Sequence, residues 1–222
     1  MRLIIPDIDK YFDFDNQVVN RLVIESPFLW RKVLQSFRNQ FERGFEYARA
    51  YDGTTELNFT ANAEIIYSPI DINANRSRLL TKLYKALTVD GISGEQLEKT
   101  YSLKRDIRNY FEQFLCDYDF DLVYNDDFDM TSLFKVIGIR FNEASNDVLN
   151  NLLEYMLCVQ TFDGDKVFIL IGLSDYMSST EKEKFHETVL AKEVKLFLLD
   201  RALYERSRLE KIVVIDDDLC EI

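Results

Sequence analysis

Aspartate is the residue type in this chain that could best carry a chemical function, because six aspartates fall within one short stretch. The stretch reads CDYDFDLVYNDDFD, from Cys116 to Asp129, and contains no lysine or arginine. Calcium takes roughly six to eight oxygen ligands, which carboxylates and backbone carbonyls can supply without EF-hand spacing. The EF-hand glycine and terminal glutamate are absent, so a calcium site and a solvated acidic loop both remain open interpretations.

The residues available to assist these carboxylates do not favour an enzyme. A two-metal nuclease centre is disfavoured because no lysine or histidine accompanies the acidic stretch. His186 is the only histidine, and the pattern places it on the polar side of a helix whose buried side carries Phe185 and Val189. We therefore expect a solvated histidine, and we assign no catalytic residue.

The turn after Leu22–Glu25 lies where a nucleotide-binding fold would place its phosphate loop. The residues there are ESPFLWRK, without a glycine, so backbone amides cannot wrap a phosphate. One interpretation is a degenerate P-loop with Lys32 as the remnant of its lysine. The favoured one is an ordinary helix with Ser26 as N-cap and Pro27 in its first turn. We expect neither ATP hydrolysis nor a bound nucleotide.

Basic residues are concentrated between Asn73 and Asn109, although the whole chain has a formal net charge of -12. This segment has eight basic residues against four acidic ones, a local balance of +4. Helical spacing places Arg78, Lys82 and Lys85 on one face. Such stripes are usually solvated, and this one gains significance only if symmetry brings several copies around one axis.

Hydrophobic periodicity predicts an α/β fold for the elements that position these residues. The apolar runs 167–173 and 194–199 are typical of parallel strands that are covered on both faces. Asp175 and Asp200 follow these runs, where open sheets bind ligands, although single acids there are also ordinary structural usage. Further strands are expected at 2–5, 11–14, 22–25, 55–59, 65–67, 139–141 and 212–215, and helices from 27 to about 44, after 73, after 93, before 138, after 147 and after 178.

The pattern divides the chain into a head with a mainly parallel central sheet and an inserted helical leg. Residues 1–72 and 130–222 form the head, and residues 73–129 form the leg, a hairpin of two helices whose second helix has Ser93 and Gln96 as a capping box. One face of that helix carries Ile107, Phe111 and Phe114. Because a hairpin buries too little of such a face alone, we expect a homo-oligomer, specifically a tetramer.

Composition is that of a globular protein, with 47% apolar and 30% charged residues. Three widely separated cysteines, Cys116, Cys158 and Cys220, match neither a zinc spacing nor a disulfide framework. The apolar run at the amino terminus stops at Pro6 without a signal-peptide pattern, and no stretch approaches the roughly 20 residues that span a bilayer. We expect a cytoplasmic protein without a membrane partner.

The carboxyl half resembles the small DNA-end-binding ring proteins of type II-A CRISPR adaptation systems. The resemblance rests on DFDLVYNDDFD leading into MTSLFKVIGIRF, then VLNNLLEYMLCVQTF, KVFILIGLSDYMSSTEKEKF, VKLFLLDRALYE and KIVVIDDD. These segments cover about residues 117–218, while the amino-terminal third agrees in pattern more than in residues.

This resemblance implies a non-catalytic homotetrameric ring that holds linear double-stranded DNA in spacer acquisition, together with other CRISPR adaptation proteins. The inward-facing basic residues would be Arg76, Arg78, Lys82, Lys85, Lys104 and Arg108. It also implies that calcium binds the acidic stretch where head and leg join, with Asp119, Asp121, Asp126 and Asp127 as ligand candidates. Val123 and Asn125 stand where an acid is expected, which leaves the ligand set open.

Two other classes of function remain as alternatives. One is a nucleotide- or metal-dependent α/β enzyme acting on nucleic acid, which would need a phosphate loop or a lysine or histidine among its acids. The other is an oligomeric scaffold that recruits only proteins. A mobility-shift assay with linear duplex separates the scaffold from the DNA-binding ring.

Overall fold

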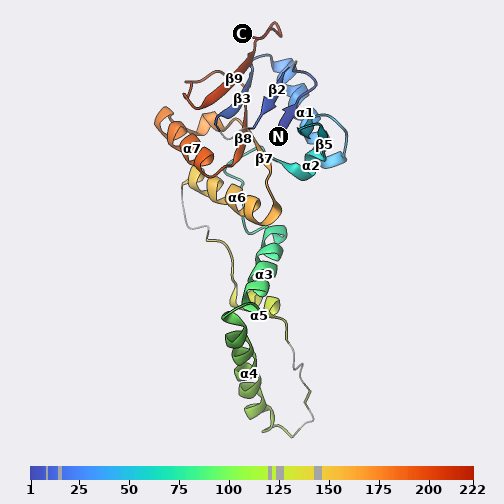
Figure 1. Ribbon diagram of the computed structural model, residues 1–222, viewed down its shortest axis with the longest axis vertical. Coiled ribbons are helices and arrows are strands. Elements are labelled where there is room, and N and C mark those ends of the chain that lie inside the picture. The colour runs from blue at the N-terminus through green and yellow to red at the C-terminus, as the bar shows by residue number, and fades with distance from the viewer. Residues whose placement is uncertain (9, 15–16, 120–121, 124–127, 143–146) are drawn as a thin grey trace. The chain divides into compact units, whose positions relative to one another are not determined.

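The computed structural model describes residues 1–8, 10–14, 17–119, 122–123, 128–142 and 147–222 (Figure 1). The chain divides into two compact units, each of which is described by itself below. Unit 1 consists of Met1–Asn73 and Glu143–Ile222, and unit 2 of Ala74–Asn142. No helix among the described residues is both long and apolar enough to cross a membrane.

Unit 1 is built on a five-stranded sheet in the order β6-β7-β8-β3-β9, and neighbouring strands are parallel throughout. Its strands are β3 (Val19–Ile24), β6 (Ala63–Ile66), β7 (Val167–Ile171), β8 (Lys195–Asp200) and β9 (Glu210–Ile215). The predicted α/β class and the mainly parallel central sheet are therefore confirmed. In the centre, β3 pairs with β8 on one side and β9 on the other, so that Arg21 lies opposite both Leu198 and Ile212.

A second, antiparallel sheet has the order β2-β1-β4-β5. It consists of β1 (Arg2–Ile4), β2 (Tyr11–Asp13), β4 (Arg49–Asp52) and β5 (Thr55–Leu57). The sequence pattern did not indicate β4. The strand predicted for 55–59 is wrong in its second half, because Asn58 caps the short helix α2 (Phe59–Asn62) by accepting a hydrogen bond from the Ala61 amide.

Helix α1 (Pro27–Arg43) begins and ends where its capping residues predict. Ser26 is extended, Pro27 starts the helix, and Gly44 ends it with a φ of 72°, which glycine adopts without steric cost. The buried side of α1 packs with the antiparallel sheet against one face of the parallel sheet, and Phe37 belongs to this core. This core contains most of the buried apolar side chains between Met1 and Phe59.

The other face of the parallel sheet packs against α6 (Val148–Asp163) and α7 (Ser179–Ala191). Ser178 and Glu181 form the predicted capping box at the start of α7. A short 3₁₀ helix (Leu173–Tyr176) follows β7, so the predicted strand 167–173 ends at Ile171. Residues 201–209, hereafter the strap, join β8 to β9, and all nine are described and lie outside helices and strands.

Unit 2 contains α3 (Ser77–Gly91), α4 (Gln96–Leu115) and α5 (Met130–Ile137). Helix α3 packs against α5 and the residues after it. The Tyr84 ring lies 6.3 Å from that of Phe134, and the Tyr84 hydroxyl donates to the Ile139 carbonyl at 2.8 Å. These contacts explain why unit 2 reaches Asn142, whereas the insert predicted from sequence was 73–129.

Two local predictions in this region are wrong. Residues 139–141 form no strand, since Asn75 and Tyr84 of unit 2 bind their backbone. Ser93 bonds to the Asp90 carbonyl instead of capping α4, whose N-cap is Glu95. No residue of α4 is buried in the single chain, so its apolar face is available for the subunit contacts expected from the sequence.

Candidate functional site

The predicted basic stripe lies on helix α3 of unit 2. Arg78, Lys82 and Lys85 occupy successive turns of one helix, outside the face that buries Leu79 and Tyr84. Arg78 and Lys85 are exposed, and Lys82 is half-buried. The structure thus brings three of the six predicted DNA-binding residues onto one accessible helical face.

The other three predicted basic residues lie at either side of this stripe in the sequence. Arg76 is the exposed N-cap of α3, and Lys104 and Arg108 are half-buried residues on successive turns of α4. The Lys104 ammonium lies 5.6 Å from the centre of the Phe128 ring, within the range of a cation–π contact. All six side chains belong to unit 2.

An aromatic cluster lies on α4 near these cations. Tyr110, Phe111 and Phe114 contact one another edge to face or tilted, with ring centres 5.4 to 5.7 Å apart. They remain 64%, 45% and 38% exposed. Three large aromatic side chains exposed together are typical of an interaction surface, because such patches are uncommon on monomers.

Three of the four predicted calcium ligands, Asp121, Asp126 and Asp127, lie outside the described residues. Asp119 is described and is exposed. Asp129 accepts a hydrogen bond from the Thr131 amide and thereby caps α5. No group of three histidine, cysteine or acidic side chains close enough to hold a metal occurs in the described part of the chain.

The turn between β3 and α1 contains only Glu25 and Ser26. The Ser26 side chain makes no capping hydrogen bond, and its carbonyl instead accepts from the Trp30 amide at 2.9 Å. Lys32, the proposed remnant of a P-loop lysine, forms an ion pair with Asp7. These contacts are those of an ordinary helix start.

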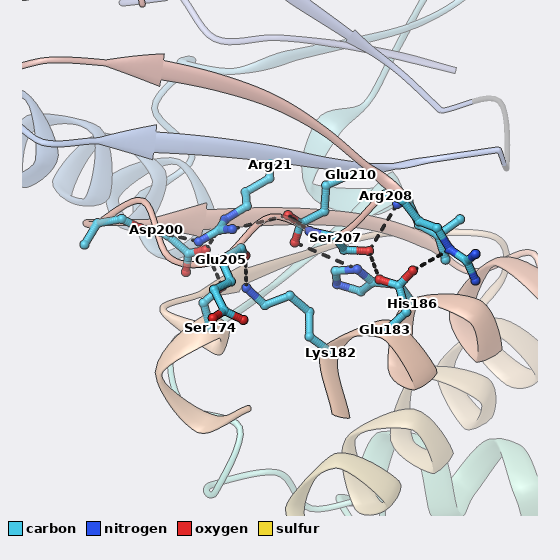
Figure 2. Close-up of polar contacts among 12 residues, drawn as sticks. Arg21, Ser174, Lys182, Glu183, His186, Asp200, Glu205, Ser207, Arg208 and Glu210 are labelled. Carbon is cyan, nitrogen blue, oxygen red and sulfur yellow. Dashed lines mark hydrogen bonds and ion pairs between the residues drawn. The ribbon is translucent and has the colours of Figure 1, made fainter. Parts of the chain in front are cut away.

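Sequence reasoning missed a buried polar cluster in unit 1, beneath the strap (Figure 2). Its centre is Arg21, whose side chain is completely buried in the middle of β3. The guanidinium donates to Asp200 at 2.7 Å and to Glu210 at 3.3 Å, and it reaches the Ala202 carbonyl at 3.4 Å. Ser174 also donates to Asp200, at 2.7 Å. The cluster thus links β3, β8, β9 and the strap.

Helix α7 contributes Lys182 and His186 to this cluster. The prediction that His186 is solvated is wrong, since its exposed fraction is 0%. Its Nδ1 lies 3.8 Å from a Glu210 carboxylate oxygen. Burial, reinforced by the positive charge of Lys182, lowers the pKa of His186 to about 4, so this imidazole is neutral at pH 7. Burial also lowers the pKa of Lys182, whose ammonium donates to the Glu205 carbonyl at 2.9 Å.

Two features of the sequence could have revealed the cluster. Arg21 interrupts the apolar strand VNRLVI, and a buried arginine requires carboxylate partners. Lys182, Phe185, His186 and Val189 have the spacing of a single helical stripe, and all four are buried. His186 was assigned to solvent because its partners are distant in the sequence.

The cluster does not show the geometry of nucleophilic catalysis. Both ring nitrogens of His186 lack a hydrogen-bond partner within the described residues, so no hydroxyl or thiol there is positioned for activation. Asp200, which follows the core of β8, is occupied by Arg21 and Ser174. Its role is therefore to neutralise a buried cation.

These features define an α/β protein with a helical unit that carries a basic helical face and exposed aromatic side chains. The family model described as CRISPR-associated protein (Cas_Csn2) matches residues 27–219. Because the match covers most of the chain, the chain belongs to this family, and the resemblance to type II-A CRISPR adaptation proteins is confirmed. No curated protein matches the sequence.

Proposed function

We propose that this CRISPR-associated adaptation protein is a non-catalytic ring that binds the ends of double-stranded DNA during spacer acquisition in antiviral defence. The observation that carries the proposal is the basic face of α3 in a chain of this family. Phosphate neutralisation needs clustered lysine and arginine, and the net charge of -12 repels DNA from most of the remaining surface. Other adaptation proteins of the CRISPR system would be its protein partners.

A homotetramer would supply what a single chain lacks. One copy of the α3 stripe offers three cations, whereas four copies around an axis would line a lumen with twelve. The aromatic side chains of α4 are exposed in the isolated chain and would be covered in such an assembly. We therefore assign the α4 surface to contacts between subunits.

In this proposal the turn from β3 to α1 does not bind a phosphate. It occupies the phosphate-loop position of an α/β fold, but it has two residues and no glycine, and Lys32 is paired with Asp7. No bound nucleotide is expected. The alternative, a nucleotide- or metal-dependent enzyme acting on nucleic acid, has no specific support among the described contacts.

The experiment that tests the proposed function compares linear and covalently closed circular duplex of the same length in a mobility-shift assay. If DNA enters the ring through a free end, linear duplex binds and closed circles bind at least tenfold more weakly. Linearising the circle with a restriction enzyme should restore binding. Equal affinity for both forms would contradict threading, and absence of binding to either would support the protein-recruiting scaffold.

Calcium is proposed as the bound metal because the acidic stretch provides hard carboxylate ligands, including Asp119 and residues 121, 126 and 127. These residues would hold the ion, which would neutralise their mutual repulsion at the joint between predicted head and leg. The ion would act on structure and assembly. No chemical step is assigned to it.

Calcium should raise the melting temperature and favour the tetramer, and magnesium should do so less. A ligand at a hundredfold excess over its Kd stabilises the folded state by about 2.7 kcal/mol, which corresponds to roughly 5 to 10 °C for a chain of this size. Melting curves and light-scattering masses with calcium, magnesium or chelator measure this. The double variant Asp126→Ala, Asp127→Ala should lose the response, whereas Asp216→Ala, Asp217→Ala serves as an acidic control. Identical curves in all conditions would show that the stretch is merely solvated.

A further inference from the structure

The strap, residues 201–209, covers the buried polar cluster of unit 1 (Figure 2). It runs from the end of β8 to the start of β9 without forming a helix or strand. Ser207 is its one buried residue, and the side chains from Arg201 to Arg206 are exposed. An irregular segment with so little apolar burial must be held by polar contacts.

Side chains of α7 and β3 provide these contacts. Lys182 donates to the Glu205 carbonyl at 2.9 Å, and Arg21 reaches the Ala202 carbonyl at 3.4 Å. At the other end of the strap, Arg208 binds Glu183 at 2.6 Å and Glu187 at 2.9 Å. The strap is thus fastened along its length to elements of the sheet and of α7.

The closed arrangement leaves several buried polar atoms without hydrogen-bond partners in the described part of the chain. They are both ring nitrogens of His186 and one carboxylate oxygen each of Asp200 and Glu210. Such atoms lose their hydration on burial and regain it as soon as water enters. Lifting the strap would therefore hydrate these groups while leaving the apolar core on the other face of the sheet intact.

We propose that the strap is an acid-sensitive latch, which opens locally to hydrate the cluster around His186 while the parallel sheet stays folded. The contacts that close it are the bonds of Lys182, Arg21 and Arg208, together with the hydrogen bonds from Ser207 to Glu183 and from Ser179 to Glu205. His186 is the group that couples opening to pH. The proposal is independent of DNA binding, since all of these residues belong to unit 1.

The charges that face His186 come from each element of the cluster. Lys182 and Glu183 on α7 and Arg21 on β3 act on the imidazole by their charge, and the Glu210 carboxylate on β9 lies 3.8 Å from its Nδ1. Of the other charged groups of the cluster, Asp200 on β8 is paired with Arg21, and Arg208 on the strap is paired with Glu183. In the closed form the imidazole has a pKa of about 4, while a hydrated imidazole has the ordinary value of 6.5. Between these values the open form binds one more proton, so opening becomes more favourable as the pH falls. The equilibrium constant for opening then rises by nearly tenfold for each pH unit of acidification.

Hydrogen exchange of the Ser207, Leu209 and Glu210 amides, corrected for the intrinsic rate, measures the opening. These amides donate to Glu210, to Ser207 Oγ and to the Ser207 carbonyl, respectively. From pH 7.0 to pH 5.0 their protection should fall about twentyfold, as linkage with the two pKa values requires. The amide of Phe197 in β8 should be far better protected at both pH values. His186→Gln should reduce the pH effect on the strap to less than threefold.

Variants of α7 test the fastening independently of His186. Lys182→Met removes the bond to the Glu205 carbonyl and should lower strap protection at pH 7.0 at least tenfold, leaving Phe197 unchanged. Lys184→Met, an exposed lysine on the same helix, should change neither. Equal protection of the strap and β8 amides would rule out the latch. So would a Lys182→Met variant in which strap protection is unchanged, or in which β8 protection falls as much as strap protection. The latch is also ruled out if the twentyfold pH effect persists in His186→Gln.

Discussion

Raising the salt concentration from 50 to 200 mM should weaken the binding of linear duplex DNA by roughly a thousandfold or more. Each phosphate neutralised by a lysine or arginine adds about 0.9 to the slope of log affinity against log salt. Six phosphate contacts are enough for this loss, and the α3 stripes of two subunits alone contain that number of cations. Fluorescence anisotropy with a labelled linear duplex across a salt series measures the slope.

Two pairs of substitutions locate the cations that bind phosphate. Arg78→Ala with Lys82→Ala should flatten the slope by about 0.9 for every phosphate that is no longer neutralised, without creating a sequence preference. Lys184→Ala with Lys192→Ala removes the same charge from exposed positions on unit 1 and should leave the slope unchanged. A slope near zero in the wild type, or equal slopes for the two variants, would show that the α3 stripe does not contact DNA phosphates and is a solvated helix face.

Arg21→Met should destabilise unit 1 by about 3 to 5 kcal/mol, because the substitution leaves buried carboxylates of Asp200 and Glu210 uncompensated. For a chain of this size the decrease in stability corresponds to a decrease in melting temperature of roughly 6 to 20 °C. Trp30, the only tryptophan, packs against the core of unit 1, so its fluorescence during urea unfolding reports on the correct unit.

A balanced variant separates charge from packing in this prediction. Arg21→Met combined with Glu210→Gln leaves the cluster with one buried cation, Lys182, and one buried anion, Asp200, so it should recover more than half of the stability that Arg21→Met removes. Arg38→Met removes an exposed arginine of α1 and should cost less than about 1 kcal/mol. If Arg21→Met costs no more than Arg38→Met, the buried ion pairs do not stabilise unit 1.

The elements that could be predicted are those whose signals are local. Ser26 and Pro27 mark the start of α1, Gly44 marks its end, and Ser178 with Glu181 marks the start of α7. These signals act within a few residues, so the sequence alone determines where the two helices begin and where α1 ends. The short strand β4 has no comparable signal, and its four residues are specified by pairing with β1 and β5.

The candidate DNA-binding face was also predictable, because helical spacing alone places Arg78, Lys82 and Lys85 together. The polar cluster was not, because its contacts are long range. Arg21 and Asp200 are separated by 179 positions in the sequence, and Lys182 and the strap residue Glu205 are separated by 23. His186 was placed in solvent for the same reason, since only the fold brings Glu210 of β9 within 3.8 Å of its ring.

The position of β3 between β8 and β9 also determines the order in which the chain can fold during synthesis. Strand β3 leaves the ribosome early, but its two neighbours in the sheet are near the other end of the sequence. Until both have been translated, β3 has no strand to pair with, and Arg21 has neither of its carboxylate partners. Unit 2, whose contacts lie within one continuous segment, can form first. Strand β3 therefore depends on late translation for its pairing, which exposes this nascent strand to aggregation and to chaperone binding.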